Sequence, residues 1–176
     1  MKKRQIRREC TDLIESLNLT VPFSLEALCQ QISERRGRQI RMAPLAFPAS
    51  GPAGLLVSTA ATDFVFYEAN TTTTHQTHVI VHEFGHLLWG HLSGPGADDP
   101  SSALVPDEIT PALIQHMLGR TQYGQPEEYA AEYFATQVLR LVSGSEFNAP
   151  SVPPDMSDLV KRLERSLHPG AGKRRW

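Results

Sequence analysis

Residues 79–89 read Val-Ile-Val-His-Glu-Phe-Gly-His-Leu-Leu-Trp, and Gly90 follows them. Apolar side chains fill both ends of this run, whereas charged and titratable side chains occur only in its middle. The pattern predicts a helix over about residues 75–89 that ends at Gly90 and lies largely in the interior. Two histidines and a glutamate are rarely buried together without partners, so this helix is expected to carry chemistry as well as core contacts.

The middle of the run, His82, Glu83 and His86, has the pattern H-E-x-x-H. Residues four apart lie about 40° apart around a helix, so both imidazoles project from one side and can bind one Zn²⁺. Glu83 lies about 100° from His82, where its carboxylate can reach a water on the metal without becoming a ligand. We therefore predict His82 and His86 as zinc ligands and Glu83 as the general base.

A zinc site with an open position for water needs a third protein ligand. A strong helix is predicted from near Pro126 to about Val142, and Glu128 and Glu132 share one of its faces. Two like charges at this spacing repel unless a cation or hydrogen-bond donors lie beside them. A carboxylate from this helix would complete a His₂Glu site. The alternative is an ordinary acidic first turn that the helix dipole favours.

The other histidines offer further candidates. His78 lies one turn before His82 on the same face and could be a third ligand, although it points past a site centred between His82 and His86. His91 lies about half a turn from the ligand face and is interpreted as a helix-end residue that interacts with the dipole. His75 and His116 are interpreted as surface or satisfied polar residues, and His116 could also lean into a cleft.

The remaining elements predict an α+β fold with a short, mainly antiparallel sheet packed on the H-E-x-x-H helix. Further helices are expected over residues 5–17, 24–37, 111–118 and 155–167, and strands over residues 39–42, 54–59 and 63–67. Residues 148–154 are rich in proline and predict a linker. Residues 155–168 predict a C-terminal helix docked on the domain, and residues 169–176 a basic tail.

The composition is that of an ordinary globular protein. The 176 residues are 40% hydrophobic and 20% charged, and no apolar run approaches the roughly 20 residues that a membrane helix needs. The basic start, residues 1–8, is not followed by the apolar stretch of a secretory signal. Cys10 and Cys29 cannot form a disulfide framework and are expected to be reduced thiols in the cytoplasm.

Charge is unevenly distributed along the chain. Between residues 42 and 160 the only Lys or Arg residues are Arg120 and Arg140, against thirteen Asp and Glu, whereas residues 1–8 and 173–175 are basic. An acidic centre can attract metal cations and basic peptides, or it is a solvated acidic surface. The basic ends could contact nucleic acid, but such short clusters are more often solvated tails.

Two motifs together resemble the ImmA/IrrE family of zinc metallopeptidases. The first is residues 81–88, Val-His-Glu-Phe-Gly-His-Leu-Leu, and the second is residues 128–135, which keep a glutamate, an alanine and a final Phe-Ala at the family's spacing. The likeness extends over roughly residues 8–142. It implies a zincin-like metallopeptidase domain over residues 1–147 with a gluzincin-like His₂Glu zinc site.

The same resemblance assigns the two carboxylates of the second motif. The family pattern is E-x-E-A-[N/D]-x-F-A, so Glu128 corresponds to the third zinc ligand. Ala130 stands in place of the second glutamate, and Glu132 stands in place of Asn or Asp. By this correspondence, Glu132 would accept a hydrogen bond from a ligand histidine and orient it.

The resemblance implies a zinc-dependent metalloendopeptidase that cleaves a helix-turn-helix repressor in phage, mobile-element or stress regulation. The expected partner is that DNA-binding protein, with no direct nucleic-acid or membrane binding. If residues 64–67 form the sheet edge above the cleft, they would pair with an extended substrate strand. Four side chains are candidates for stabilising the oxyanion: His116, Tyr123, Tyr129 and Tyr133.

Two other functions compete with this hypothesis. In the first, the protein is a non-proteolytic regulatory module that docks a repressor, and its zinc site is structural or latent. In the second, it is a metal hydrolase of small molecules, which a narrow closed pocket would favour over a groove beside an edge strand.

Overall fold

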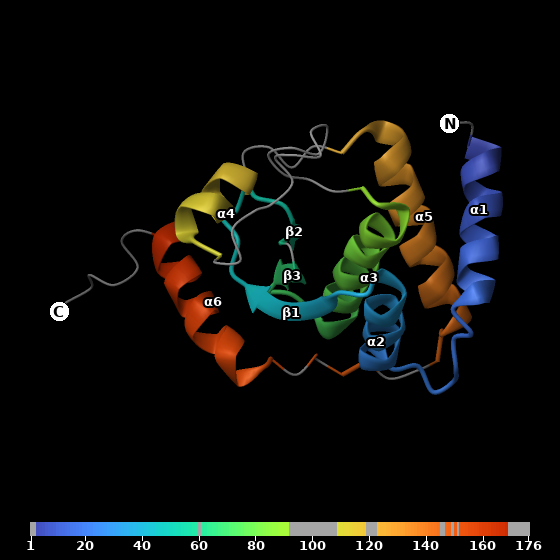
Figure 1. Ribbon diagram of the computed structural model, residues 1–176, viewed down its shortest axis with the longest axis horizontal. Helices are drawn as coiled ribbons and strands as arrows, with labels where there is room; N and C mark the ends of the chain where they lie inside the picture. Colours follow the sequence, from blue (N-terminus) through green and yellow to red (C-terminus); the bar gives the residue numbers. More distant parts are fainter. Residues whose placement is uncertain are drawn as a thin grey trace.

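The computed structural model describes residues 3–59, 61–91, 109–118, 123–144, 147–148, 150 and 152–168 (Figure 1). The helices of these residues are α1 (Lys3–Ser16), α2 (Leu25–Arg36), α3 (Thr73–Trp89), α4 (Pro111–Leu118), α5 (Gln125–Leu141) and α6 (Pro154–Leu167). The strands are β1 (Gln39–Leu45), β2 (Gly54–Ser58) and β3 (Thr62–Glu68). The α+β fold class is therefore confirmed. The predicted basic tail at 169–176 and part of the linker at 148–154 lie outside the described residues.

Local capping signals set the ends of the two helices that precede and follow the sheet. The Ser24 hydroxyl accepts a hydrogen bond from the Ala27 N–H at 3.1 Å, and Gly37 ends α2 with a left-handed φ of 63°. α3 begins two residues earlier than expected because the Thr72 hydroxyl accepts from the N–H of His75 at 3.3 Å. A polar side chain that satisfies an orphan N–H fixes where such a helix starts.

The sheet has the order β1-β3-β2, and this corrects two expectations. β2 is antiparallel to β3, as the hairpin signal predicts, but β1 is parallel to β3, so the sheet is mixed rather than mainly antiparallel. Residues 64–67 belong to the central strand and are not an edge. The chain reaches β2 through residues 46–53, which cross from one side of β3 to the other. Strand periodicity carries no information about that path.

Both faces of the sheet are covered, which explains why β3 is apolar along most of its length. One face packs against α2 and α3, and the opposite face packs against α4 and α6 (Figure 1). α6 contacts β1 and α4 and buries Met156 and Leu163. No helix within the described ranges is long and apolar enough to cross a membrane.

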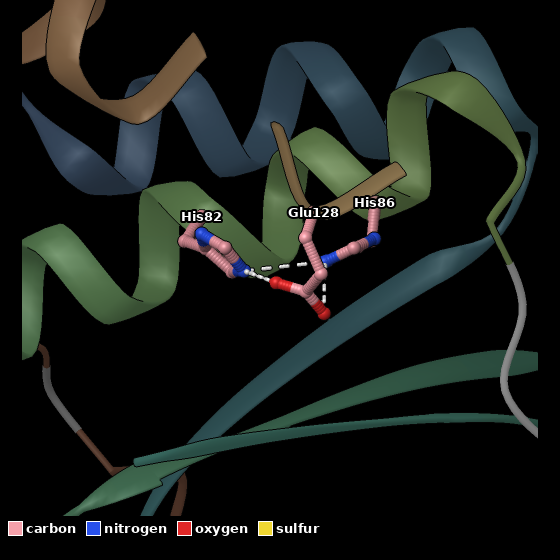
Figure 2. Close-up of side chains that lie close together, drawn as sticks. All are labelled: His82, His86 and Glu128. Atoms are coloured by element: carbon pink, nitrogen blue, oxygen red, sulfur yellow. Dashed lines mark hydrogen bonds and ion pairs between the residues drawn. The ribbon is translucent and has the colours of Figure 1, made fainter. Parts of the chain in front are cut away.

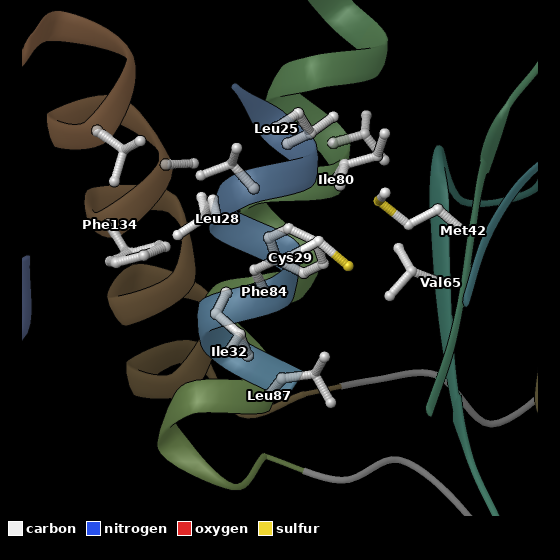
Figure 3. Packing of buried hydrophobic residues seen from close by; sticks show 14 of the residues in the cluster. Leu25, Leu28, Cys29, Ile32, Met42, Val65, Ile80, Phe84, Leu87 and Phe134 are labelled. Atoms are coloured by element: carbon white, nitrogen blue, oxygen red, sulfur yellow. The ribbon is translucent and has the colours of Figure 1, made fainter. Parts of the chain in front are cut away.

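The larger core cluster gathers around α2 and α3. Leu28 and Ile32 of α2 lie close to Phe84 of α3 and Phe134 of α5, and Met42 and Val65 extend the cluster to the sheet (Figure 3). Both cysteines are free and lie in this cluster. α3 is thus held between the sheet and α5.

α3 and α5 approach each other closely at one point. A methyl group added to Gly85 would lie 3.0 Å from Cα of Ala131 and 3.3 Å from its Cβ. Ala130, Ala131 and Ala135 are fully buried. The small alanines of α5 thus permit close helix packing, and the partner residue on α3 is the glycine inside the H-E-x-x-H motif.

A buried ionic group joins α2, β3 and the end of α3. Asp63 is fully buried, and its carboxylate lies 2.7 Å from Nε of Arg36 and 3.4 Å from Nε of Arg38. Arg36 also donates to the carbonyl of Leu87 at 2.8 Å. The Asp63 carboxylate therefore positions the Arg36 guanidinium, and Arg36 in turn joins the last turn of α3 to α2.

Replacing Asp63 with alanine is expected to lower the free energy of unfolding by about 3 kcal/mol, because two largely buried guanidinium groups lose their counter-ion. The matched control is Asp155→Ala, which removes the exposed partner of Arg41 and is expected to cost less than about 1 kcal/mol. Urea unfolding of both variants measures the difference. Equal losses would contradict the role assigned to Asp63.

Candidate metal centre

α3 presents the H-E-x-x-H residues in its C-terminal half. Gly90 ends the helix with a φ of 69°, its N–H donates to the carbonyl of Leu87, and the N–H of His91 donates to the carbonyl of His86 at 2.9 Å. This is the Schellman arrangement, which satisfies the last carbonyls of a helix. His82 and His86 lie one turn apart and face α5 (Figure 2).

Three potential ligand atoms converge from α3 and α5 (Figure 2). Nε2 of His82 and Nε2 of His86 lie 3.2 Å apart. The Glu128 carboxylate lies between the two rings, with one oxygen 3.5 Å from Nε2 of His82 and the other 3.9 Å from Nε2 of His86. Among the described residues, these three side chains form a cluster that could hold a metal ion.

The spacing suits a small tetrahedral cation. Zinc bonds of about 2.0–2.1 Å in tetrahedral geometry separate neighbouring ligand atoms by about 3.3 Å. The three observed separations, from 3.2 to 3.9 Å, lie close to that value. Two imidazoles and one carboxylate are also the donor set that zinc accepts in sites with an open position.

Glu128 reaches this position from the first turn of α5. Pro126 occupies an early helical position, and the Glu127 carboxylate accepts a hydrogen bond from the N–H of Gly124 at 2.8 Å. Glu127 therefore caps the helix, and the next residue, Glu128, points toward α3. The neighbouring carboxylates have separate roles because they project from α5 in different directions.

Glu132 lies beside His82 on the side opposite to Nε2. Its Oε2 atom is 3.4 Å from Nδ1 of His82 and 3.1 Å from Nε2 of His78. An acceptor at Nδ1 leaves Nε2 of His82 free to face the site. His78 thus contacts Glu132 and is not part of the cluster formed by His82, His86 and Glu128.

Glu83 is buried between α3 and the edge strand β2. Its side chain is close to Gly54, where an added methyl group would lie 2.5 Å from Oε1. Oε2 accepts no hydrogen bond from any described residue. Burial, together with the nearby charge of Glu128, raises the pKa of Glu83 to about 8. In the absence of a cation this carboxyl group is therefore protonated near neutral pH.

Burial also keeps the two histidines neutral. Burial, together with the neighbouring imidazoles of His82 and His91, lowers the pKa of His86 to about 3. Burial lowers the pKa of His82 as well, although Glu128 and Glu132 oppose this effect. A neutral imidazole has a nitrogen lone pair available for a metal, so the pair is ready to bind at neutral pH without losing a proton.

A cavity of about 220 Å³ adjoins these side chains. Its lining consists of Pro52, Ala53, Gly54, Leu55, Leu56, His82, Glu83, Tyr123 and Glu128. Glu83 and Glu128 thus line the same space beside β2. Residues 52–56, which include the start of the edge strand, and two of the candidate metal ligands, His82 and Glu128, share this space.

Among the four oxyanion candidates, Tyr123 alone lines this cavity in the described part of the chain. Its ring stacks on His86 with the centroids 3.6 Å apart. The other two tyrosines face α1: Tyr129 accepts a hydrogen bond from Arg7 at 2.7 Å, and the Arg7 guanidinium lies over the Tyr133 ring. His116 is exposed on α4.

His91 contacts a candidate ligand, whereas the sequence predicts a helix-end residue that interacts with the helix dipole. Its Nδ1 atom lies 3.2 Å from Nδ1 of His86, so the ring folds back onto a candidate ligand. A helical wheel places residue 91 half a turn away from the ligand face. Gly90 leaves the helical path, however, and only that turn brings the imidazole back to His86.

Comparisons of the chain with protein-family models, with curated proteins and with solved structures find no match. The two motifs and the geometry around them are therefore the observations that bear on function.

Glu128→Ala is expected to lower zinc affinity sharply, because the candidate site loses the carboxylate that lies between the two imidazoles. Glu127→Ala removes a neighbouring carboxylate that caps α5, so it is expected to retain zinc near the wild-type level while losing about 1 kcal/mol of stability. Zinc content after dialysis decides between the two. Equal retention by both variants would refute the assignment of Glu128.

Gly54→Ala is expected to destabilise the protein by about 1–3 kcal/mol, because the added methyl group overlaps Glu83 and Val79. Gly124→Ala is the control, since its methyl group would meet no atom of the described residues closer than 3.5 Å, and it is expected to cost at most about 1 kcal/mol. Thermal and urea unfolding measure both effects. A neutral Gly54→Ala variant would show that Glu83 can move away freely.

Proposed function

We propose that this protein is a zinc-dependent metalloendopeptidase with a zincin-like domain of the ImmA/IrrE type, and that it acts on a DNA-binding repressor in the cytoplasm. The observation that carries the proposal is the convergence of His82, His86 and Glu128 around one point, with the buried Glu83 beside them. A purely structural helix has no need for a buried carboxyl group next to two neutral imidazoles.

His82, His86 and Glu128 would hold the zinc ion, and Glu132 would orient His82 through Nδ1. When bound, zinc supplies a Lewis acid that polarises a carbonyl group and makes water acidic near neutral pH. The cavity beside these residues leaves room for a substrate group at the open position. The burial of His86 excludes solvent from one side of the site.

Glu83 would act as the general base and then as the general acid. Its carboxylate would take a proton from the attacking water and pass it to the leaving amine. The contact with Gly54 holds the carboxyl group between α3 and β2, next to the cavity where water and substrate would meet. A group fixed in this way would need little reorganisation during the reaction.

The edge strand supports a peptide as the substrate. Ala53 and Thr59 are bonded to β3 at the two ends of β2, so by the antiparallel alternation Gly54 and Leu56 direct their N–H and C=O groups away from β3. Both residues line the cavity. An extended chain could pair with these groups and place one of its carbonyls near the metal ligands. This role belongs to β2 rather than to residues 64–67.

The choice of a repressor as the substrate rests on the resemblance to the ImmA/IrrE family. Acidic side chains around the site, with Glu128 and Glu132 half exposed, would repel nucleic-acid phosphates. They would favour instead a basic or neutral peptide segment. An extended linker between the domains of a regulator has this character.

Glu83→Gln is expected to keep stoichiometric zinc and to lose hydrolysis by a factor of about 10²–10⁴ or more, because the base is lost while the ligands remain. The assay incubates the wild type and the variant with the regulator encoded beside the protein, with and without a chelator. Cleavage at an interdomain linker by the wild type alone is the expected result.

Three other outcomes would be informative. Full turnover by Glu83→Gln would refute the role of Glu83. Zinc-loaded protein that binds the regulator without cutting it would favour a non-proteolytic binding module. A salt-dependent mobility shift of promoter DNA by the purified protein, in the absence of any repressor, would contradict the target class.

A further inference from the structure

The two candidate ligand histidines have different partners at Nδ1. His82 faces the half-exposed carboxylate of Glu132 at 3.4 Å, whereas His86 faces the imidazole of His91 at 3.2 Å. His86 is fully buried, so water is not available to bond its Nδ1 atom. His91 is therefore the partner that orients the His86 ring at Nδ1, whereas solvent can also reach the carboxylate beside Nδ1 of His82.

The positions of the protons follow from this geometry. A metal at the site requires the lone pair of His86 Nε2, and the ring proton of His86 must then lie on Nδ1. Two ring nitrogens 3.2 Å apart form a hydrogen bond only if one donates and the other accepts. His91 must accept at Nδ1, and its own proton must lie on Nε2.

The end of α3 places His91 for this role. The left-handed Gly90 turns the chain back, and the N–H of His91 donates to the carbonyl of His86 at 2.9 Å. His91 thus contacts His86 twice, through its backbone and through its ring. Tyr123 packs on the face of the same His86 ring, with the two planes 16° apart, so the imidazole is constrained at its edge and at its face.

We infer that His91 is a positioning residue that accepts the Nδ1 proton of His86 and so fixes this ring with Nε2 facing the metal. The inference rests on the proposed metal site and does not depend on which bond the protein cleaves. It adds a histidine to the centre that is not itself a ligand. It also links the C-cap of α3 to metal binding, because the turn at Gly90 that ends the helix places the acceptor, Nδ1 of His91, beside His86.

Two substitutions separate this role from simple packing. In asparagine the side-chain oxygen is as far from Cα, in bonds, as Nδ1 is in histidine, so His91→Asn keeps an acceptor at the required position. In glutamine the oxygen is one bond farther away and corresponds to Nε2, so His91→Gln does not. The control His75→Gln makes the same change at an exposed position in the first turn of α3.

The experiment measures zinc dissociation constants by competition with a chelator, the visible spectrum of the Co²⁺-loaded protein, and the unfolding temperature of the metal-free protein. His91→Gln is expected to weaken zinc binding about 10–100-fold and to alter the Co²⁺ spectrum. His91→Asn and His75→Gln are expected to stay within about threefold of the wild type. The metal-free unfolding temperatures should be similar, because the backbone bond from residue 91 to His86 is kept in every variant.

Equal zinc affinity in His91→Gln and the wild type would overturn the inference. A parallel loss of affinity and of metal-free stability in both His91 variants would also overturn it, since packing would then explain the effect. Wild-type protein that binds no zinc would refute the inference together with the proposed function. Wild-type protein that binds zinc but cleaves no regulator would refute the peptidase proposal alone, and the zinc affinities of the variants would still decide the role of His91.

Discussion

The contact between Gly85 and Ala131 is the constraint on which the convergence of His82, His86 and Glu128 depends. At this point α3 and α5 come so close that a methyl group on Gly85 would lie 3.0 Å from the backbone of Ala131. Glu128 lies one turn before Ala131 and His86 lies next to Gly85. The close approach of the two backbones therefore brings the carboxylate to the imidazoles. Larger side chains here would separate the helices and remove Glu128 from the site.

Burial shapes the chemistry of the site. Because their side chains are largely buried, the imidazoles of His82 and His86 stay neutral, and burial with the nearby charge of Glu128 makes Glu83 a weak acid with a pKa of about 8. Such groups lower the stability of the metal-free fold, since a buried polar atom such as Oε2 of Glu83 has lost its water. A bound cation would offset part of this cost. These features fit the proposed zinc site, in which the ion would lie among His82, His86 and Glu128.

The sheet supports the site from the other side. Helices cover both faces of β3, so the sheet is held firmly, and only the outer edge of β2 is left beside the cavity. Gly54 brings this edge against Glu83. The same strand therefore limits the position of the carboxyl group, and it is the strand with which a peptide would pair in the proposed function. Asp63 and Arg36 complete the frame by fixing the last turn of α3 to α2.

The helices can be predicted from the sequence because their signals are local: Ser24, Gly37 and Gly90 cap them, and the spacing of His82 and His86 puts both rings on one face. It also indicated that Glu128 and Glu132 share a face of α5. Three features follow only from the folded chain: β1 runs parallel to β3, β2 is the edge beside the cavity, and Tyr123 and His91 contact His86. These contacts depend on the loop that crosses β3, on the turn at Gly90 and on the packing of α3 against α5. The periodicity of side chains along the sequence carries no information about distances between residues that the fold brings together.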